Sequence, residues 1–136
     1  KRQGLKATWH EFKGNKCSEI EKAPVNGTYP VEDVMIPKKV KGNIGLIIKG
    51  YFNAPQDDIY TFALLSDDGS TLTIDSEQIV DNDGPHGPKE IVGQKALAKG
   101  YHPMELRYFD QNGGQLKLKV TGSDGKEIPF THLYAH

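Results

Sequence analysis

Cysteine is nearly absent from this sequence of 136 residues, in which Cys17 is the one residue of its kind. No disulfide can form within the chain, and zinc sites built from four cysteines or from two cysteines and two histidines are excluded. No uninterrupted apolar run approaches the ~18 residues of a membrane-spanning helix. The chain opens on Lys1-Arg2-Gln3-Gly4, without an initiator methionine or an apolar signal segment. We therefore expect a piece of a larger multidomain protein.

An excess of charge of one sign is also missing. Lys and Arg number 17 against 18 Asp and Glu, so the chain lacks the basic field that attracts a phosphate backbone. We expect no nucleic acid among its partners and no membrane span. The sequence has no Gly-x-Ser-x-Gly nucleophile elbow. No catalytic residue is predicted, and the chain is not expected to be an enzyme.

Glycine and proline are plentiful, at fifteen and eight residues, and they form short clusters at the interval typical of turns between strands. The length suits one domain with one core. We predict an all-β fold over residues 1–136, a single antiparallel β-barrel or sandwich with little helix. Turns that join antiparallel strands into hairpins are expected at Asn53-Ala54-Pro55, Asp68-Gly69, Asp83-Gly84-Pro85, Lys99-Gly100, Asn112-Gly113-Gly114 and Asp124-Gly125.

Apolar residues alternate with polar ones in several segments, as in strands with one buried face. Residues 42–52 are predicted to be half-buried, and residues 18–36 to be a surface excursion with one short helical turn. Trp9 is predicted to be buried on an edge strand, and Tyr51, Tyr101 and Phe109 to be exposed. The predicted core consists of the inward residues Tyr60, Phe62, Leu64, Leu72, Ile74, Leu106, Leu118 and Val120.

The segments that follow this alternation also carry a recognisable order of motifs. Asp58-Ile59-Tyr60-Thr61-Phe62 is followed by a block from Ser66 to Asp75 with the letters SDDGSTLTID. Val80-Asp81-Asn82-Asp83-Gly84-Pro85-His86 and Leu97-Ala98-Lys99-Gly100-Tyr101-His102-Pro103 come next. This series resembles the core signature of the protective-antigen (PA14) domain family from about Gly4 to Tyr134. Asp58 departs from it, since the family has Gly before the Tyr-x-Phe strand.

The resemblance implies a β-barrel or compact sandwich from an exported protein. In the adhesin members, two successive Asp residues joined by a cis peptide hold a calcium ion that contacts sugar hydroxyls, and an Asn from a later loop completes the site. The matching residues here are Asp67 and Asp68, with Asn112 or Asp110 in the later loop. The resemblance thus implies calcium as the one cofactor. A hairpin turn explains Asn112-Gly113 equally well.

Two interpretations of the acid pair stay open at the level of sequence. Carboxylates are ligands that Ca²⁺ prefers, but adjacent side chains on a regular strand point to opposite faces, so the backbone must leave strand geometry for both to reach one ion. In the alternative, Asp67, Asp68 and Gly69 form a turn with a trans peptide bond, whose carboxylates accept the N–H groups of residues 69–71. His86, in a Pro-rich and Gly-rich loop, is a further candidate contact to a sugar.

The family resemblance also sets the expected function. We expect a non-catalytic accessory module of a secreted or periplasmic glycosidase, such as a β-hexosaminidase or β-glucosidase, that binds glycan or positions the catalytic domain. The expected partners are that glycan and that catalytic domain, outside the cell, in the periplasm or at the cell surface. The alternatives are a structural or protein-interaction module without affinity for sugar, and a calcium-dependent lectin of the adhesin type.

Overall fold

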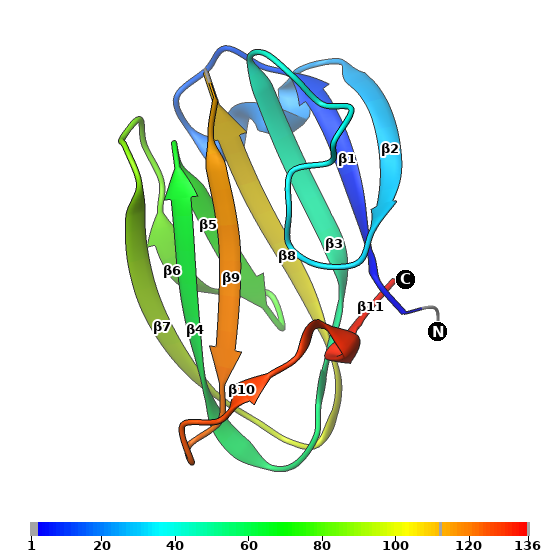
Figure 1. The fold of residues 1–136 in the computed structure, drawn as a ribbon, viewed down its shortest axis with the longest axis vertical. Helices are drawn as coiled ribbons and strands as arrows, with labels where there is room; N and C mark the ends of the chain where they lie inside the picture. The colour runs from blue at the N-terminus through cyan, green and yellow to red at the C-terminus, as the bar shows by residue number, and fades with distance from the viewer. Residues whose placement is uncertain (1–2, 112, 136) are drawn as a thin grey trace.

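The computed structural model describes residues 3–111 and 113–135, which form two antiparallel sheets packed face to face (Figure 1). The larger sheet runs in the order β2 (Val25–Val31), β1 (Leu5–Glu11), β3 (Ile44–Ala54), β8 (Gly100–Asp110), β5 (Ser70–Ile74) and β6 (Glu77–Asn82), with β11 (Leu133–Tyr134) paired to β3. The smaller sheet runs in the order β10 (Glu127–Ile128), β9 (Gln115–Thr121), β4 (Asp58–Asp67) and β7 (Lys89–Leu97). Within the described residues no strand joins the two sheets into a closed barrel, so the sandwich form is observed.

The predicted alternation places the main core between the sheets. Of the eight predicted core residues, seven are buried, and Leu118 is partly exposed at the edge of the core. Phe52 joins them, with its ring edge-to-face against the rings of Tyr60 at 5.3 Å and Phe62 at 5.7 Å. Contacts of this geometry add to the free energy gained from burying apolar surface. The inward face of each strand is thus the one that the sequence predicts.

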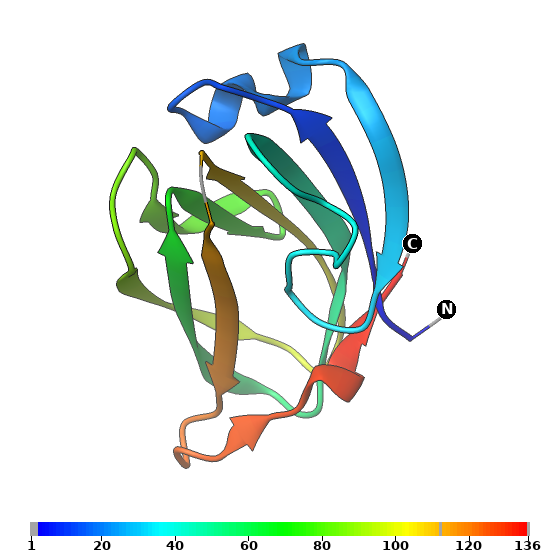
Figure 2. The same cartoon turned by 45° about the horizontal axis from the view of Figure 1, so that its top comes forward.

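A second, smaller core lies on the outer face of the larger sheet. The 3₁₀ helix η1 (Cys17–Lys22) packs there against β3 and β8, as Figure 2 shows at the upper end of the sheet. The prediction of an exposed Phe109 is therefore wrong, because its ring is fully buried and lies edge-to-face on Phe12 at 6.0 Å. Strand β3 is buried on both faces over much of its length, not half-buried, since Ile47 belongs to this second core.

The stretch predicted to be a surface excursion contains more structure than expected. Its helical turn is found as η1, but residues 25–31 form β2, the outermost strand next to β1. Strand β2 carries Pro30, which an edge strand tolerates because one of its sides needs no N–H donor. Trp9 on β1 is partly buried against the core. Its strand lies between β2 and β3, so the prediction of an edge strand is wrong.

The predicted turns fall between strands, but few of them close hairpins. Hairpins join β5 to β6 and β9 to β10, the first through Asp75 and Ser76, whose φ angles of 52° and 65° fit a tight two-residue turn. The other predicted turns carry the chain from one sheet to the other. The hairpin prediction for Asn112-Gly113 is wrong in this sense, because β8 and β9 belong to different sheets. No helix in the described residues is long and apolar enough to span a membrane.

The chain ends lie close together at one side of the sandwich (Figure 1). Gln3 pairs with Tyr134, and the N–H of Gly4 donates to the carbonyl of Leu133 at 2.7 Å. Loops at the far end of the sandwich join β4 to β5, β6 to β7 and β8 to β9. These three loops carry the candidate residues: Asp67 and Asp68 lie at the first, His86 in the second and Asp110 at the start of the third.

Candidate functional site

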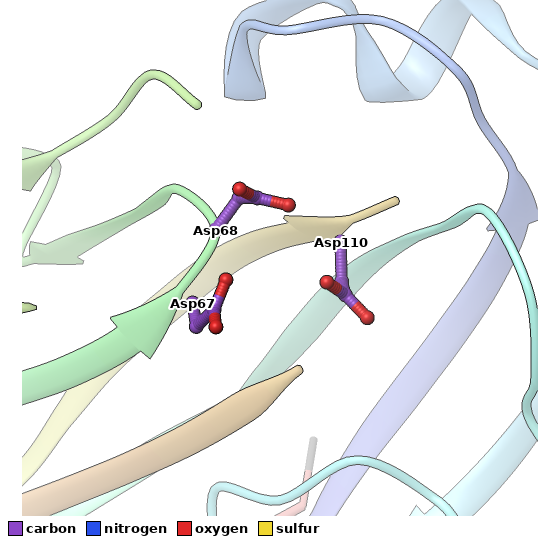
Figure 3. Close-up of side chains that lie close together, drawn as sticks. All are labelled: Asp67, Asp68 and Asp110. Carbon is purple, nitrogen blue, oxygen red and sulfur yellow. The ribbon is translucent and has the colours of Figure 1, made fainter. Parts of the chain in front are cut away.

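Three aspartates from both sheets meet at this loop end (Figure 3). Asp67 is the last residue of β4, Asp68 follows it, and Asp110 is the last residue of β8. One carboxylate oxygen from each lies within 4.8 Å of the others. Asp67 and Asp68 are half-buried, whereas Asp110 is 4% exposed. The carboxylates are therefore close enough to share one cation while part of the cluster faces solvent.

The backbone of the acid pair is attached to the end of β8. The peptide bond between Asp67 and Asp68 is cis, the configuration that the family resemblance implies. The N–H of Asp68 donates to the carbonyl of Phe109 at 3.2 Å, and the N–H of Phe109 donates to the carbonyl of Gly69 at 3.0 Å. The hydroxyl of Tyr108 donates to the carbonyl of Asp67 at 2.7 Å. These bonds fix the pair relative to Asp110, two residues beyond Tyr108.

The carboxylate of Asp68 accepts hydrogen bonds from two other loops. The N–H of His86 donates to its Oδ1 at 3.1 Å, and the N–H of Gln111 donates to its Oδ2 at 3.2 Å. The turn interpretation predicted a trans bond and donors at residues 69–71, but the bond is cis and the donors to the Asp68 carboxylate belong to His86 and Gln111. The pair is thus a junction between loops distant in sequence, which a local turn motif does not describe.

His86 lies at the site through its backbone. Its ring nitrogens face its own loop, with Nδ1 2.7 Å from the carbonyl oxygen of Gly87 and Nε2 2.8 Å from that of Asn82. The buried side chain of Asn82 anchors the loop by donating to the carbonyls of Leu64 at 3.2 Å and Lys89 at 2.8 Å. The loop that carries His86 is therefore held in place beside Asp68.

Two glycines that the sequence analysis did not single out as site residues allow the close packing of these loops. A Cβ atom on Gly69 would lie 2.5 Å from the ring of Phe109 and 2.7 Å from the backbone of Gly84. A Cβ atom on Gly114 would overlap the hydroxyl of Tyr108 and the carbonyl of Asp67. The sequence offered one signal, a glycine directly after the acid pair and another in the loop after Asp110. It does not show which backbone segments approach these glycines.

The acidic cluster also affects the neighbouring phenol. Burial raises the pKa of Tyr108, and the charges of Asp110, Asp67 and Asp68 raise it further, because a phenolate there would be poorly solvated and would face like charges. Tyr108 therefore keeps its proton and its hydrogen bond to Asp67 across the physiological pH range. Carboxylates this close together repel each other, so N–H donors or a cation stabilise the arrangement.

The structure thus brings Asp67, Asp68 and Asp110 together and places the backbone of His86 beside them. The fourth predicted ligand, Asn112, lies outside the described residues. The side chains of Tyr51 and Tyr101, predicted to be exposed, lie at the other end of the larger sheet and take no part in this cluster. The candidate site is therefore built from the ends of β4 and β8, the loops that follow them and the β6–β7 loop that carries His86.

Comparison with known proteins agrees with the fold and the motif order. The family model described as the PA14 domain matches residues 1–130. No curated protein sequence matches the chain. A PA14 sugar-binding domain from an RTX adhesin shares the fold with a TM-score of 0.82 at 17% identity, over 100% of both chains.

Two further solved structures come from yeasts. The epithelial adhesin 9 A domain from Candida glabrata, solved with Galβ1-3GlcNAc, has a TM-score of 0.69 at 13% identity, over 94% of this chain and 85% of that one. A β-glucosidase from Kluyveromyces marxianus, solved with glucose, has a TM-score of 0.68 at 17% identity, over 88% of this chain but 16% of the enzyme. At these identities the likeness concerns the fold. With its family model matched over nearly the whole chain, the protein belongs to the PA14 domain family and is a non-catalytic module.

Proposed function

We propose that this PA14 domain binds glycans through a calcium ion held by Asp67, Asp68 and Asp110. The observation that carries the proposal is the convergence of three carboxylates, from two sheets, within 4.8 Å. Calcium takes six to eight oxygen ligands at about 2.3–2.6 Å, so three carboxylates would leave positions for carbonyls, water and ligand hydroxyls. Asn112 remains a predicted ligand from the loop after Asp110.

The exposure of the cluster supports a sugar as the outer ligand. Asp67 and Asp68 are half-buried at a loop end, so an ion bound there would have one side toward solvent. Two neighbouring hydroxyls of a pyranose are oxygen ligands of the kind that calcium prefers. The RTX adhesin domain is described as sugar-binding, and the Candida adhesin domain was solved with a disaccharide, which favours the same ligand class here.

We further propose that the domain serves an exported carbohydrate-active protein as an accessory module, outside the cell or at its surface. The yeast β-glucosidase contains a similar fold over 16% of its length, which supports such an arrangement. A β-glucosidase or β-hexosaminidase is the predicted parent enzyme. The glycan bound by the module and the catalytic domain beside it are the corresponding partners.

A calcium titration followed by thermal unfolding tests the metal site. Calcium at about 100 times its dissociation constant stabilises the folded state by about 2.7 kcal/mol, and we expect the melting temperature to rise by roughly 10 °C. Asp68→Asn should abolish this rise, because it removes a charged ligand. Asp124→Asn is the matched control, since Asp124 is an exposed acid in the β9–β10 turn, and should keep the rise.

Retention on a glycan array, with calcium and with EDTA, tests the sugar. We expect retention with calcium that is lost in EDTA and lost in Asp68→Asn. A melting temperature that calcium leaves unchanged would contradict the metal site. A rise in melting temperature without retention of any glycan would keep the ion and reject the lectin function.

A further inference from the structure

The outer face of the larger sheet is covered by η1 over one part of its length, and over another part it carries one exposed tyrosine and two half-buried ones. The covered part lies under η1, where Ile47 and Phe109 are buried. Toward the other end, the outward positions of β3, β8 and β11 are Tyr51, Tyr101 and Tyr134. Their direction follows from the strand alternation, since Phe52 on β3, Met104 on β8 and Leu133 on β11 have the opposite parity and belong to the core between the sheets.

The three tyrosines form one group, although they come from three strands. Tyr51 is directly opposite Tyr134 in the sheet, and Tyr101 lies on the neighbouring strand. The ring of Tyr101 is edge-to-face with those of Tyr51 at 6.3 Å and Tyr134 at 5.3 Å. Tyr101 itself is 47% exposed. Two edge-to-face contacts orient this ring while much of it faces solvent.

A hollow of about 320 Å³ with both polar and apolar lining lies on the same face of the sheet. It begins at Pro103, the residue opposite Tyr51, and continues along the sheet between β3, β8 and the β5–β6 turn. Lys49 and Glu105 form an ion pair of 3.5 Å on its wall. Thr73 and Ser76, which also line the hollow, carry hydroxyl groups. Donors and acceptors thus lie on the same face as an exposed aromatic ring.

We propose that this tyrosine face, Tyr51, Tyr101 and Tyr134 with the hollow on the same face of the sheet, is a second glycan site that works without calcium. Its ligand class is a flat oligosaccharide of β-1,4-linked pyranoses, whose C–H faces can lie against the ring of Tyr101. The hydroxyls at the edges of such a chain would exchange hydrogen bonds with Lys49, Glu105 and Ser76. An aromatic platform beside a few convergent polar groups is the usual composition of a small-ligand site.

A glycan suits this face better than a protein partner does. A stable protein interface buries about 800 Å² on each side and has an apolar centre. The exposed large apolar residues Val25, Ile59, Val92, Tyr101 and Phe130 lie instead on five different elements. Four of the six residues that line the hollow carry a charge or a hydroxyl group, and the other two are Pro103 and Met104. The local chemistry is that of a sugar-binding surface.

The tyrosine face is distant from the acidic cluster. Tyr101 and Asp110 are at opposite ends of β8, and nine residues of strand span roughly 30 Å. Both proposed sites bind glycans, so the proposal rests on the proposed function for its class of ligand. Binding at the tyrosine face is measured with calcium removed, which separates it from binding at the acidic cluster.

The experiment is a titration of ¹⁵N-labelled protein with cellotetraose, and separately with N-acetylchitotetraose, in EDTA. We expect amide shifts confined to β3, β8, β11 and the β5–β6 turn. Tyr101→Ala should weaken the affinity at least about tenfold, and Tyr101→Phe should retain it, because the ring remains. Asp68→Asn should bind as the unchanged protein does.

The amide spectrum of each variant shows whether it is folded, and Tyr51→Ala replaces Tyr101→Ala if that variant unfolds. Absence of shifts with both tetrasaccharides would overturn the proposal. Shifts at the loops around Asp68 would also overturn it. If Asp68→Asn loses calcium-dependent binding but keeps the amide shifts in EDTA, the tyrosine face binds glycan independently of the acidic cluster.

Discussion

Gly114 sets how closely the loop after β8 approaches the acidic cluster. A Cβ atom at this position would lie 2.6 Å from Cγ of Asp110 and would overlap the hydroxyl of Tyr108 and the carbonyl of Asp67. The last two atoms form the hydrogen bond that holds the acid pair. A side chain at this position therefore has to displace the groups that fix the cluster.

We predict that Gly114→Ala destabilises the domain by about 1–3 kcal/mol and weakens calcium binding, because the overlap separates Asp67 from Asp110. Urea denaturation and a calcium titration measure the two effects. Gly87→Ala is the matched control, since nothing lies within 4 Å of its added Cβ, and should stay within about 0.5 kcal/mol. Equal behaviour of the two variants would refute the role of Gly114.

At single positions, the sequence was informative where residue type and motif agree. The resemblance pointed to Asp67 and Asp68, and to Asp110 in the later loop, and the three carboxylates do converge. The N–H donors of Asp68 could not be predicted, because they come from loops 18 and 43 residues away. Phe109 was misplaced because strand alternation marks its side of the sheet as outward but does not reveal that η1 covers it.

At the scale of elements, alternation identified the inward residues well in the central strands. Tyr60, Phe62 and Leu64 on β4 are buried against Leu72 and Ile74 on β5, as expected. Alternation did not predict the strand order, because a period of two shows which face of a strand is buried but not to which sheet the strand belongs. Most predicted turns are therefore crossings between sheets, and β2 was missed because its Gly27 and Pro30 obscure the period.

Burial along one cross-strand pair gives a test of this packing. Leu64 on β4 is fully buried, and its partner Leu118 on β9 is partly exposed at the wall of a small cavity. We predict that Leu64→Ala costs about 2–5 kcal/mol of unfolding free energy. Leu118→Ala should cost less, about 1–2 kcal/mol, because less of its surface leaves water on folding.

Lys117→Ala, on the outward face of the same strand, is the control and should change the free energy by less than about 0.5 kcal/mol. Urea denaturation of the three variants ranks them. A larger loss in Lys117→Ala than in Leu118→Ala would mean that the register of β9 is shifted by one residue, which exchanges its two faces.

At the scale of the whole molecule, the chain passes repeatedly between the two sheets. Strands β3, β5, β6 and β8 belong to the larger sheet, whereas β4, β7 and β9, which alternate with them in sequence, belong to the smaller. The inward faces of the two sheets share one core. The acidic cluster adds a further link, since Asp67 ends a strand of one sheet and Asp110 a strand of the other.

We therefore predict that the sheets unfold together and that calcium stabilises both. Trp9, the single tryptophan, lies on β1 in the larger sheet, so its fluorescence follows that sheet, whereas far-UV circular dichroism follows all strands. The two urea midpoints should coincide, and calcium should raise them equally, because an ion that binds the native state stabilises the whole cooperative unit. A Trp9 midpoint below that of the dichroism, or one that calcium leaves in place while the other rises, would show that the sheets unfold separately and that the ion stabilises the loop end alone.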